Sequence, residues 1–243
     1  MSQTFQTQLQ TIERETAPHP DAAVIWMHGL GADANDFVPL VPELDLRSEL
    51  RMSGGAPLAI RFVFPNAPVM PVTINGGMAM RAWYDILHLD LGGVGTSGIP
   101  REDEKGLRAS QAMVEELIAA QVARGIAAER ILLAGFSQGA AMTLMTGLRH
   151  PSRLAGLIVL SGYLPLGVQL AVERTEANHD VPIFMAHGSY DPVVRLERAL
   201  ASRDALIQHG YQVEWHTYPM PHSVGPEEID AIGRFLRRVL DRV

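Results

Sequence analysis

The chain contains no cysteine among its 243 residues, and this absence excludes several kinds of chemistry. A disulfide framework, a thiolate nucleophile and a zinc or iron–sulfur site held by cysteines all need that residue. Any nucleophile must therefore come from serine, threonine, aspartate or lysine.

The chain also lacks any block of like charge. It has 27 acidic and 20 basic residues, which gives a net charge of -7. A basic surface for the phosphate backbone is not indicated, so we expect no nucleic-acid partner. With 47% hydrophobic and 19% charged residues, the composition is that of a globular protein. Because no internal repeat or Pro/Ser-rich linker divides the chain, we expect one domain over residues 1–243.

Long hydrophobic runs that would cross a membrane are absent on closer inspection. Residues 131–148 and 154–172 carry no charge and have about the spanning length. Both contain Gly, Ser, Gln or Pro in positions that favour strand, turn and buried helix, so we expect no membrane insertion. The first ten residues lack the basic start and apolar run of a secretory signal. We therefore expect a cytoplasmic protein, with residues 1–19 loosely ordered.

Short apolar runs recur along the chain, most of them bounded by Gly or Pro. Continuous runs of this kind are typical of strands buried on both faces of a parallel sheet. The last run differs, because its polar and apolar residues alternate as in an edge strand. The predicted strands are 22–27, 58–64, 131–134, 157–160, 183–186 and 212–217.

Helical periodicity lies between these runs and is clearest at 106–124, which Gly125 ends. The predicted helices are 106–124, 138–149, 196–209 and 226–240. Alternating strands and helices predict an α/β fold with a mostly parallel central sheet and helices on both faces. The stretch 65–100 is rich in Gly, Pro and Met, and we expect a long loop region there that serves a functional site.

The most informative peptide is Gly135-Phe136-Ser137-Gln138-Gly139. It follows a predicted strand and precedes a predicted helix, as a G-x-S-x-G nucleophile elbow does. In that turn, glycines avoid collisions with neighbouring backbone and the serine hydroxyl stands at the helix N-terminus. Ser137 is therefore the candidate nucleophile.

A serine nucleophile needs a histidine base and an acid that orients it, in the chain order Ser, Asp, His. Asp191 follows the strand 183–186, and His222 follows the strand 212–217. Both therefore lie at the carboxyl edge of the sheet, where sites form. His187 is the alternative base, but it precedes Asp191 and reverses the expected order. We predict a triad of Ser137, Asp191 and His222, with His187 a packed residue beside it.

The oxyanion of the tetrahedral intermediate in acyl transfer needs two backbone N–H donors. The amide of Gln138 directly follows the nucleophile at the helix N-terminus. The peptide His28-Gly29-Leu30-Gly31 follows the first apolar strand, and its glycines let the backbone bend toward the site. We predict the amides of Leu30 and Gln138 as the two donors.

Together these peptides resemble the phospholipase/carboxylesterase family, which includes carboxylesterases and acyl-protein thioesterases. The resemblance covers residues 20–240 and implies an α/β-hydrolase fold, without a separate cap domain, and the triad and donors named above. It also implies carboxylic ester or thioester substrates and no metal or organic cofactor; several members are dimers, which suggests a homodimer. The motifs are His28-Gly-Leu-Gly31, Phe64-Pro-Asn-Ala-Pro68, Trp83-Tyr-Asp85, Gly135-Phe-Ser-Gln-Gly139, His187-Gly-Ser-Tyr-Asp-Pro192 and His222-Ser-Val224.

Three positions depart from the family pattern. Asn66 stands where members commonly have His, Tyr84 where many have Phe, and Arg195 where Pro often occurs. None of the three belongs to the predicted triad, but the first two bear on substrate preference.

The predicted function is that of a serine carboxylesterase for short to medium acyl chains, acting on small-molecule esters or thioesters. The alternatives are an acyl-protein thioesterase or a lysophospholipase, a peptidase or lactone hydrolase with the same residues, and a silent binding protein of the same fold. Met78, Met80 and Trp83 in the stretch 65–100 are predicted to line the acyl site. The alternative for that stretch is a loop whose apolar side chains pack on its own core.

Overall fold

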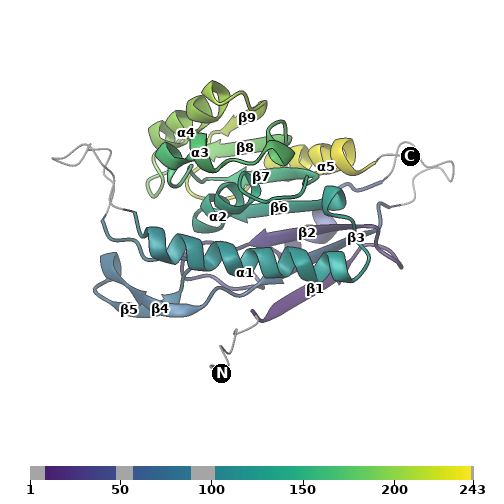
Figure 1. Cartoon of the computed structure of the whole chain (residues 1–243), viewed down its shortest axis with the longest axis horizontal. Coiled ribbons are helices and arrows are strands. Elements are labelled where there is room, and N and C mark those ends of the chain that lie inside the picture. The colour runs from purple at the N-terminus through teal and green to yellow at the C-terminus, as the bar shows by residue number, and fades with distance from the viewer. Residues whose placement is uncertain (1–8, 48–56, 89–101, 242–243) are drawn as a thin grey trace.

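The computed structural model describes residues 9–47, 57–88 and 102–241. A seven-stranded sheet in the order β1-β3-β2-β6-β7-β8-β9 forms the centre of the molecule, and every pairing in it is parallel except that of β1 with β3 (Figure 1). β4 and β5 form a separate antiparallel pair. The strands are β1 (Thr11–Glu15), β2 (Ala22–Met27), β3 (Ile60–Pro65), β4 (Val69–Val72), β5 (Met78–Arg81), β6 (Ile131–Phe136), β7 (Gly156–Leu160), β8 (Ile183–Gly188) and β9 (Val213–Tyr218).

Five α-helices and five short 3-10 helices accompany the sheet in the described part of the chain. The α-helices are α1 (Glu104–Ala123), α2 (Gln138–Gly147), α3 (Leu170–Glu173), α4 (Leu196–Gln208) and α5 (Pro226–Leu240). The 3-10 helices are η1 (Val38–Glu43), η2 (Thr73–Asn75), η3 (Ala128–Arg130), η4 (Gly167–Gln169) and η5 (Glu176–Asn178). Within the described ranges, none of the helices combines the length and the apolar character needed to cross a membrane.

Alternate residues of the central strands enter two separate cores, one on each face of the sheet. In β2, Ala23, Ile25 and Met27 belong to a core that apolar residues of α1, α2 and α4 complete. Ala22, Val24 and Trp26 pack on the other face with residues of η1 and α5. Because successive side chains of a strand point to opposite faces, a strand that is apolar throughout fits a sheet covered on both sides. The predicted α/β-hydrolase fold with helices on both faces is therefore confirmed.

Each predicted strand and α-helix is present, with ends that differ by a few residues. The strand predicted at 212–217 is β9, and it forms one edge of the sheet as its alternating pattern indicated. All its residues are partly or fully exposed. The edge position explains this exposure, because only one side of the strand is paired.

Two segments contain more structure than the sequence indicated. Residues 11–15, placed in a loosely ordered segment 1–19, form β1, which pairs with β3 from Thr11–Pro65 to Glu15–Arg61. Residues 1–8 lie outside the described residues. In the loop region 65–100, β4 and β5 form a hairpin that turns through Gly76 and Gly77, both with positive φ. Residues 89–100 of that region lie outside the described residues.

Four predicted site segments lie at one edge of the sheet. Ser137 follows β6, His28 follows β2, Asp191 lies just beyond β8, and His222 lies just beyond β9. These strands form two parallel pairs, β2 with β6 and β8 with β9, and β7 lies parallel between the pairs, so their carboxyl ends meet at the same edge. The fold therefore brings residues from distant parts of the sequence to one place.

Candidate active site

The turn between β6 and α2 holds Ser137 in a strained conformation, with φ 55° and ψ -114°. Positive φ is uncommon for a residue with a Cβ and is typical of a nucleophile elbow. The flanking glycines make the turn possible. A Cβ on Gly135 would lie 2.2 Å from the carbonyl of Gly139, and a Cβ on Gly139 would lie 2.2 Å from the Met27 oxygen. Both positions therefore need glycine for steric reasons.

The predicted acid and base are hydrogen-bonded to each other. His222 Nδ1 lies 2.6 Å from Asp191 Oδ2, and the carboxylate is fully buried. Its other oxygen accepts hydrogen bonds from the amides of Val193, at 2.8 Å, and Val194, at 2.9 Å. Burial raises the pKa of Asp191, but these bonds and the His222 charge outweigh it, and the pKa lies below its usual value. Asp191 is therefore ionised and fixed, which suits a group that orients an imidazole.

Close packing at Gly188 sets the distance between the loop that carries Asp191 (the acid loop) and the loop that carries His222 (the base loop). A Cβ there would lie 2.3 Å from the Pro221 oxygen and 2.4 Å from the Met220 oxygen. The amide of Tyr190 also donates to the Met220 carbonyl, at 3.1 Å. The absence of a side chain at Gly188 thus allows the loop that carries His222 to approach the loop that carries Asp191.

The elbow contacts His222 through the ring of Phe136 rather than through a hydrogen bond of Ser137. The ring of Phe136, the residue before it, lies 4.6 Å from the His222 ring. Within the described chain, the Ser137 hydroxyl and His222 share no hydrogen bond. Such bonds are often long in an enzyme without substrate and tighten when substrate binds. The structure thus joins Asp191 to His222 and places His222 beside the elbow.

His187, the alternative base, is buried and lies next to Asp191. Its Nε2 lies 2.8 Å from the Val194 carbonyl oxygen and 3.4 Å from Asp191 Oδ2. Burial lowers its pKa, which favours the neutral ring as donor to that carbonyl. His187 therefore packs against the acid loop, as the chain order of the triad indicated.

The two predicted oxyanion donors lie on either side of the elbow. Gln138 is the first residue of α2, and the first amides of a helix have no intrahelical partner. On the other side, a Cβ on Gly29 would lie 3.4 Å from the Ser137 Cβ. This distance shows how closely residues 28–31, the oxyanion loop, approach the serine. Within the described residues, the Leu30 amide has no hydrogen-bond acceptor. Both amides are thus available to a bound group.

The predicted acyl-site residues divide into two sets. Met78 lies on β5 with 64% of its surface exposed, and a Cβ on Gly31 would lie 3.9 Å from the sulfur of Met80. The hairpin therefore stands beside the oxyanion loop. Trp83 is buried, with 1% exposure, and its indole donates to the His28 carbonyl at 2.9 Å.

Comparison with known proteins identifies the family. The model of the phospholipase/carboxylesterase family matches residues 8–240. Acyl-protein thioesterase 1 of Neurospora crassa is 42% identical over 91% of this chain and 88% of its own. The protein of the same name from Gibberella zeae is 40% identical over 90% of this chain and 91% of its own.

The chain belongs to the phospholipase/carboxylesterase family. Solved structures agree. Arabidopsis thaliana SOBER1 has a TM-score of 0.77 at 30% identity, over 90% of this chain and 99% of its own. Zea mays acyl-protein thioesterase 2 has a TM-score of 0.77 at 26% identity, over 95% and 99%. The protein is accordingly an enzyme, a carboxylic ester hydrolase.

The positions that depart from the family pattern lie close to the site. Asn66 Oδ1 accepts a hydrogen bond from the Ala34 amide at 2.9 Å, which ties β3 to the segment after the oxyanion loop. The Tyr84 hydroxyl lies 2.5 Å from the Tyr163 hydroxyl, and both are buried. Arg195 is the N-cap residue of α4. Tyr84 therefore adds a buried hydrogen bond that a Phe lacks.

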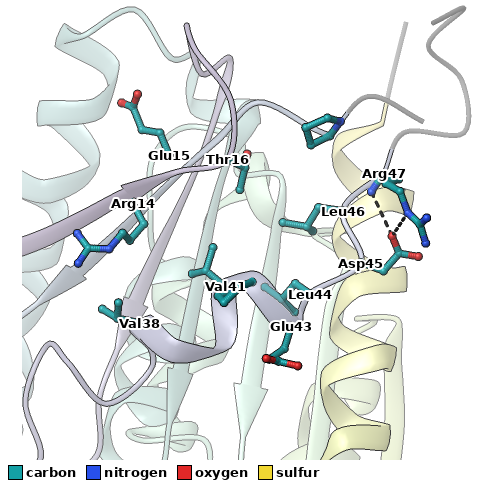
Figure 2. A pocket seen from close by; sticks show the side chains of 12 residues that line it. Arg14, Glu15, Thr16, Val38, Val41, Glu43, Leu44, Asp45, Leu46 and Arg47 are labelled. Atoms are coloured by element: carbon teal, nitrogen blue, oxygen red, sulfur yellow. Dashed lines mark hydrogen bonds and ion pairs between the residues drawn. The ribbon is translucent and has the colours of Figure 1, made fainter. Parts of the chain in front are cut away.

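A groove of about 770 Å³ lies elsewhere, at the start of β3 (Figure 2). Thr16 binds the backbone of Ile60 there, and Leu58 binds the carbonyl of Leu46. Because parallel strands run from this edge toward Ser137, the groove lies at the opposite edge of the sheet from the candidate site. Its lining is Arg14, Glu15, Thr16, Val38, Val41, Pro42, Glu43, Leu44, Asp45, Leu46, Arg47 and Pro57.

Sequence reasoning did not indicate the side-chain contacts that hold the oxyanion loop. The His28 ring and the Gln138 side chain both form hydrogen bonds with backbone groups around this loop. The only available signal was that both belong to motifs at strand ends. Within ranges 9–47, 57–88 and 102–241, no group of three His, Asp or Glu residues is arranged to hold a metal ion.

Proposed function

We propose that this enzyme hydrolyses acyl thioesters carried by proteins. One observation carries the choice over a small-ester carboxylesterase: the curated relatives that cover about nine-tenths of the chain are named acyl-protein thioesterase 1. That assignment was the alternative in the sequence analysis, where the main prediction was a short- to medium-chain carboxylesterase.

We propose Ser137, His222 and Asp191 as the catalytic triad. His222 takes the Ser137 proton while the serine oxygen attacks the acyl carbonyl, and the amides of Leu30 and Gln138 bind the oxyanion. Asp191 orients His222 and stabilises its charged form; the buried 2.6 Å contact between them supports this role. The thiol leaves with the proton from His222, and water repeats the sequence to release the acid.

The β4–β5 hairpin supplies the acyl wall in this proposal. Met78 and Val69 are largely exposed on it, with 64% and 63% of their surface accessible, and Met80 lies next to the oxyanion loop. Flexible thioether side chains adapt to a long apolar chain. Trp83 is 1% exposed, so in this proposal it does not meet the acyl chain.

The test is a matched series of p-nitrophenyl esters and acyl thioesters from acetyl to palmitoyl, together with an S-palmitoylated peptide. We expect kcat/KM to be highest for long thioesters and the peptide to be deacylated. Ser137→Ala should abolish turnover of every substrate, whereas Ser152→Ala, at an exposed serine, should not change it. Highest activity on short esters would return the assignment to a carboxylesterase, and an active Ser137→Ala protein would overturn the triad.

The acyl wall has its own test. Met78→Ala combined with Met80→Ala should shift the preference along the acyl series, while Val168→Ala, at an exposed valine on η4, should not. An unchanged chain-length profile would reject the wall. Two further expectations stay predictions: a homodimer, which light scattering of the purified enzyme tests, and a cytoplasmic location, which cell fractionation tests.

A further inference from the structure

Three consecutive peptide units of the oxyanion loop are each held by a different group. The first joins His28 to Gly29, and its carbonyl accepts the Trp83 indole N–H at 2.9 Å. The third joins Leu30 to Gly31, and its N–H donates to the Arg81 carbonyl at 2.8 Å. The middle unit, between Gly29 and Leu30, carries the N–H that we assign to the oxyanion.

The His28 side chain holds this middle unit more closely than the Ala32 amide, which also donates to the Gly29 carbonyl, at 3.3 Å. Its Nε2 accepts a hydrogen bond from the Ala67 amide at 3.0 Å, so the proton of the neutral ring must be on Nδ1. Nδ1 lies 2.6 Å from the Gly29 carbonyl oxygen and donates to it. Burial lowers the pKa of His28, in agreement with a neutral ring.

The geometry of the peptide bond transfers this contact to Leu30. The Gly29 carbonyl and the Leu30 N–H belong to one planar unit, and the described residues contain no cis peptide bond. In a trans unit the C=O and N–H vectors point in opposite directions. Fixing the direction of the carbonyl therefore fixes the direction of the Leu30 N–H.

Trp83 also connects this donor to the second one. Its backbone N–H donates to Gln138 Oε1 at 2.8 Å, and Gln138 Nε2 donates to the Tyr84 carbonyl at 2.7 Å. The Trp83 carbonyl accepts from the Ser110 hydroxyl. Gln138, whose amide is the second donor, thus binds the backbone of residues 83–84 through its side chain. Trp83 in turn binds the loop that carries the first donor, the Leu30 amide.

We propose that His28 and Trp83 are positioning residues that set the direction of the Leu30 amide, and its distance from the Gln138 amide, for the oxyanion. This inference rests on the proposed function. Loss of one complete donor from an oxyanion hole typically costs about 10²–10³ in kcat. Misdirection of one donor should cost less, about 10- to 100-fold, and should appear in kcat rather than in KM.

The variants are His28→Leu, His28→Asn and Trp83→Phe. Leucine removes both ring nitrogens, whereas the asparagine amide places an N–H donor close to the position of Nδ1. Phenylalanine removes the indole N–H of Trp83 and keeps an aromatic ring. Trp26→Phe is the matched control, because Trp26 is equally buried but its indole nitrogen has no partner among the described residues.

Activity is measured on one p-nitrophenyl ester, so that the choice between ester and thioester does not affect the result. Titration with a fluorophosphonate counts the active sites in each preparation. The affinity for a trifluoromethyl ketone, whose adduct with serine carries an oxyanion, reports the donors directly. A merely structural role would lower the number of active sites and leave both the kcat per site and this affinity unchanged.

We expect His28→Leu and Trp83→Phe to lower kcat per active site by about 10- to 100-fold and to leave KM nearly unchanged. The affinity for the trifluoromethyl ketone should fall by a factor similar to that for kcat. His28→Asn should recover much of the loss, and Trp26→Phe should match the wild type. If His28→Leu does not fold, Trp83→Phe decides. Wild-type kcat and ketone affinity in the folded variants, or an equal loss in Trp26→Phe, would overturn the proposal. Failure of the fluorophosphonate to label wild-type Ser137 would instead overturn the proposed function.

Discussion

Replacing Glu228 by Gln should make the free energy of unfolding of the enzyme less sensitive to rising pH. Glu228 lies in the first turn of α5 and is fully buried. Within the described residues, its carboxylate oxygens have no hydrogen-bond partner of normal geometry. Burial raises its pKa from 4.5 to about 8, and the nearby Gly225 amide offsets this only in part. A helix N-terminus favours a carboxylate by only about 0.3–1 kcal/mol, so burial dominates.

The sign follows from the direction of this shift. Below pH 4.5 the carboxyl is protonated in both the folded and the unfolded chain, and its contribution to stability is fully present. As the pH rises toward 8, the unfolded chain releases the proton while the folded chain keeps it, so stability is lost. At 1.36 kcal/mol per pH unit, the loss between pH 5 and pH 8 is about 3.5 kcal/mol. Gln cannot ionise and avoids this loss.

The assay is urea unfolding, followed by circular dichroism, of the wild type and Glu228→Gln at pH 5, 6, 7 and 8. The difference in unfolding free energy between the two proteins should change by about 3.5 kcal/mol in favour of the variant. Comparing the two proteins cancels other groups that titrate in this range. Glu227→Gln, at the exposed neighbouring position, should follow the wild type. A difference for Glu228→Gln that stays constant across the four pH values would refute the reasoning.

Three further predictions follow from single contacts. Gly139→Ala should prevent formation of folded protein, because its Cβ would lie 2.2 Å from the Met27 oxygen, whereas Gly167→Ala meets only contacts of 3.4 Å or more and should fold; circular dichroism of the soluble fractions checks this. Asp103→Ala removes the N-cap of α1 and should lower the free energy of unfolding by about 1–2 kcal/mol, with little loss for Asp103→Asn; equal values for the two would contradict the cap. Asp191→Asn should lower kcat by about 10⁴ while the exposed Asp204→Asn does not, and a near-normal kcat would count against Asp191 as the acid.

Hydrophobic pattern alone predicted the central sheet because its strands are buried on both faces. A strand such as β2 is apolar at every position, and its short length and flanking Pro and Gly favour a strand over a buried helix. Chain order then placed Ser137, Asp191 and His222 at one edge, since parallel strands share the direction of their carboxyl ends. These predictions needed no knowledge of side-chain contacts.

β1 could not be predicted in this way. Its sequence Thr-Ile-Glu-Arg-Glu has one apolar residue, and ion pairs hold its acidic side chains. Arg124 binds Glu13 at 2.6 Å, and Arg61 binds Glu15 at 2.9 Å. Both arginines come from distant parts of the chain, so no local pattern reveals the pairing. The β4–β5 hairpin did carry a local signal, Asn75-Gly76-Gly77, because such residues accept the positive φ that a tight turn requires.

The contacts around the oxyanion loop lie beyond sequence reasoning for a different reason. A sequence shows that His28 and Trp83 belong to motifs, but Trp83 is as suitable for an acyl wall as for a buried donor. The choice depends on where one indole N–H points, and a residue 55 positions away in the chain provides its acceptor. Triad members are recognised by type and order, because only a few side chains perform that chemistry. The groups that orient backbone amides have no such restriction, so the three-dimensional structure is needed to find them.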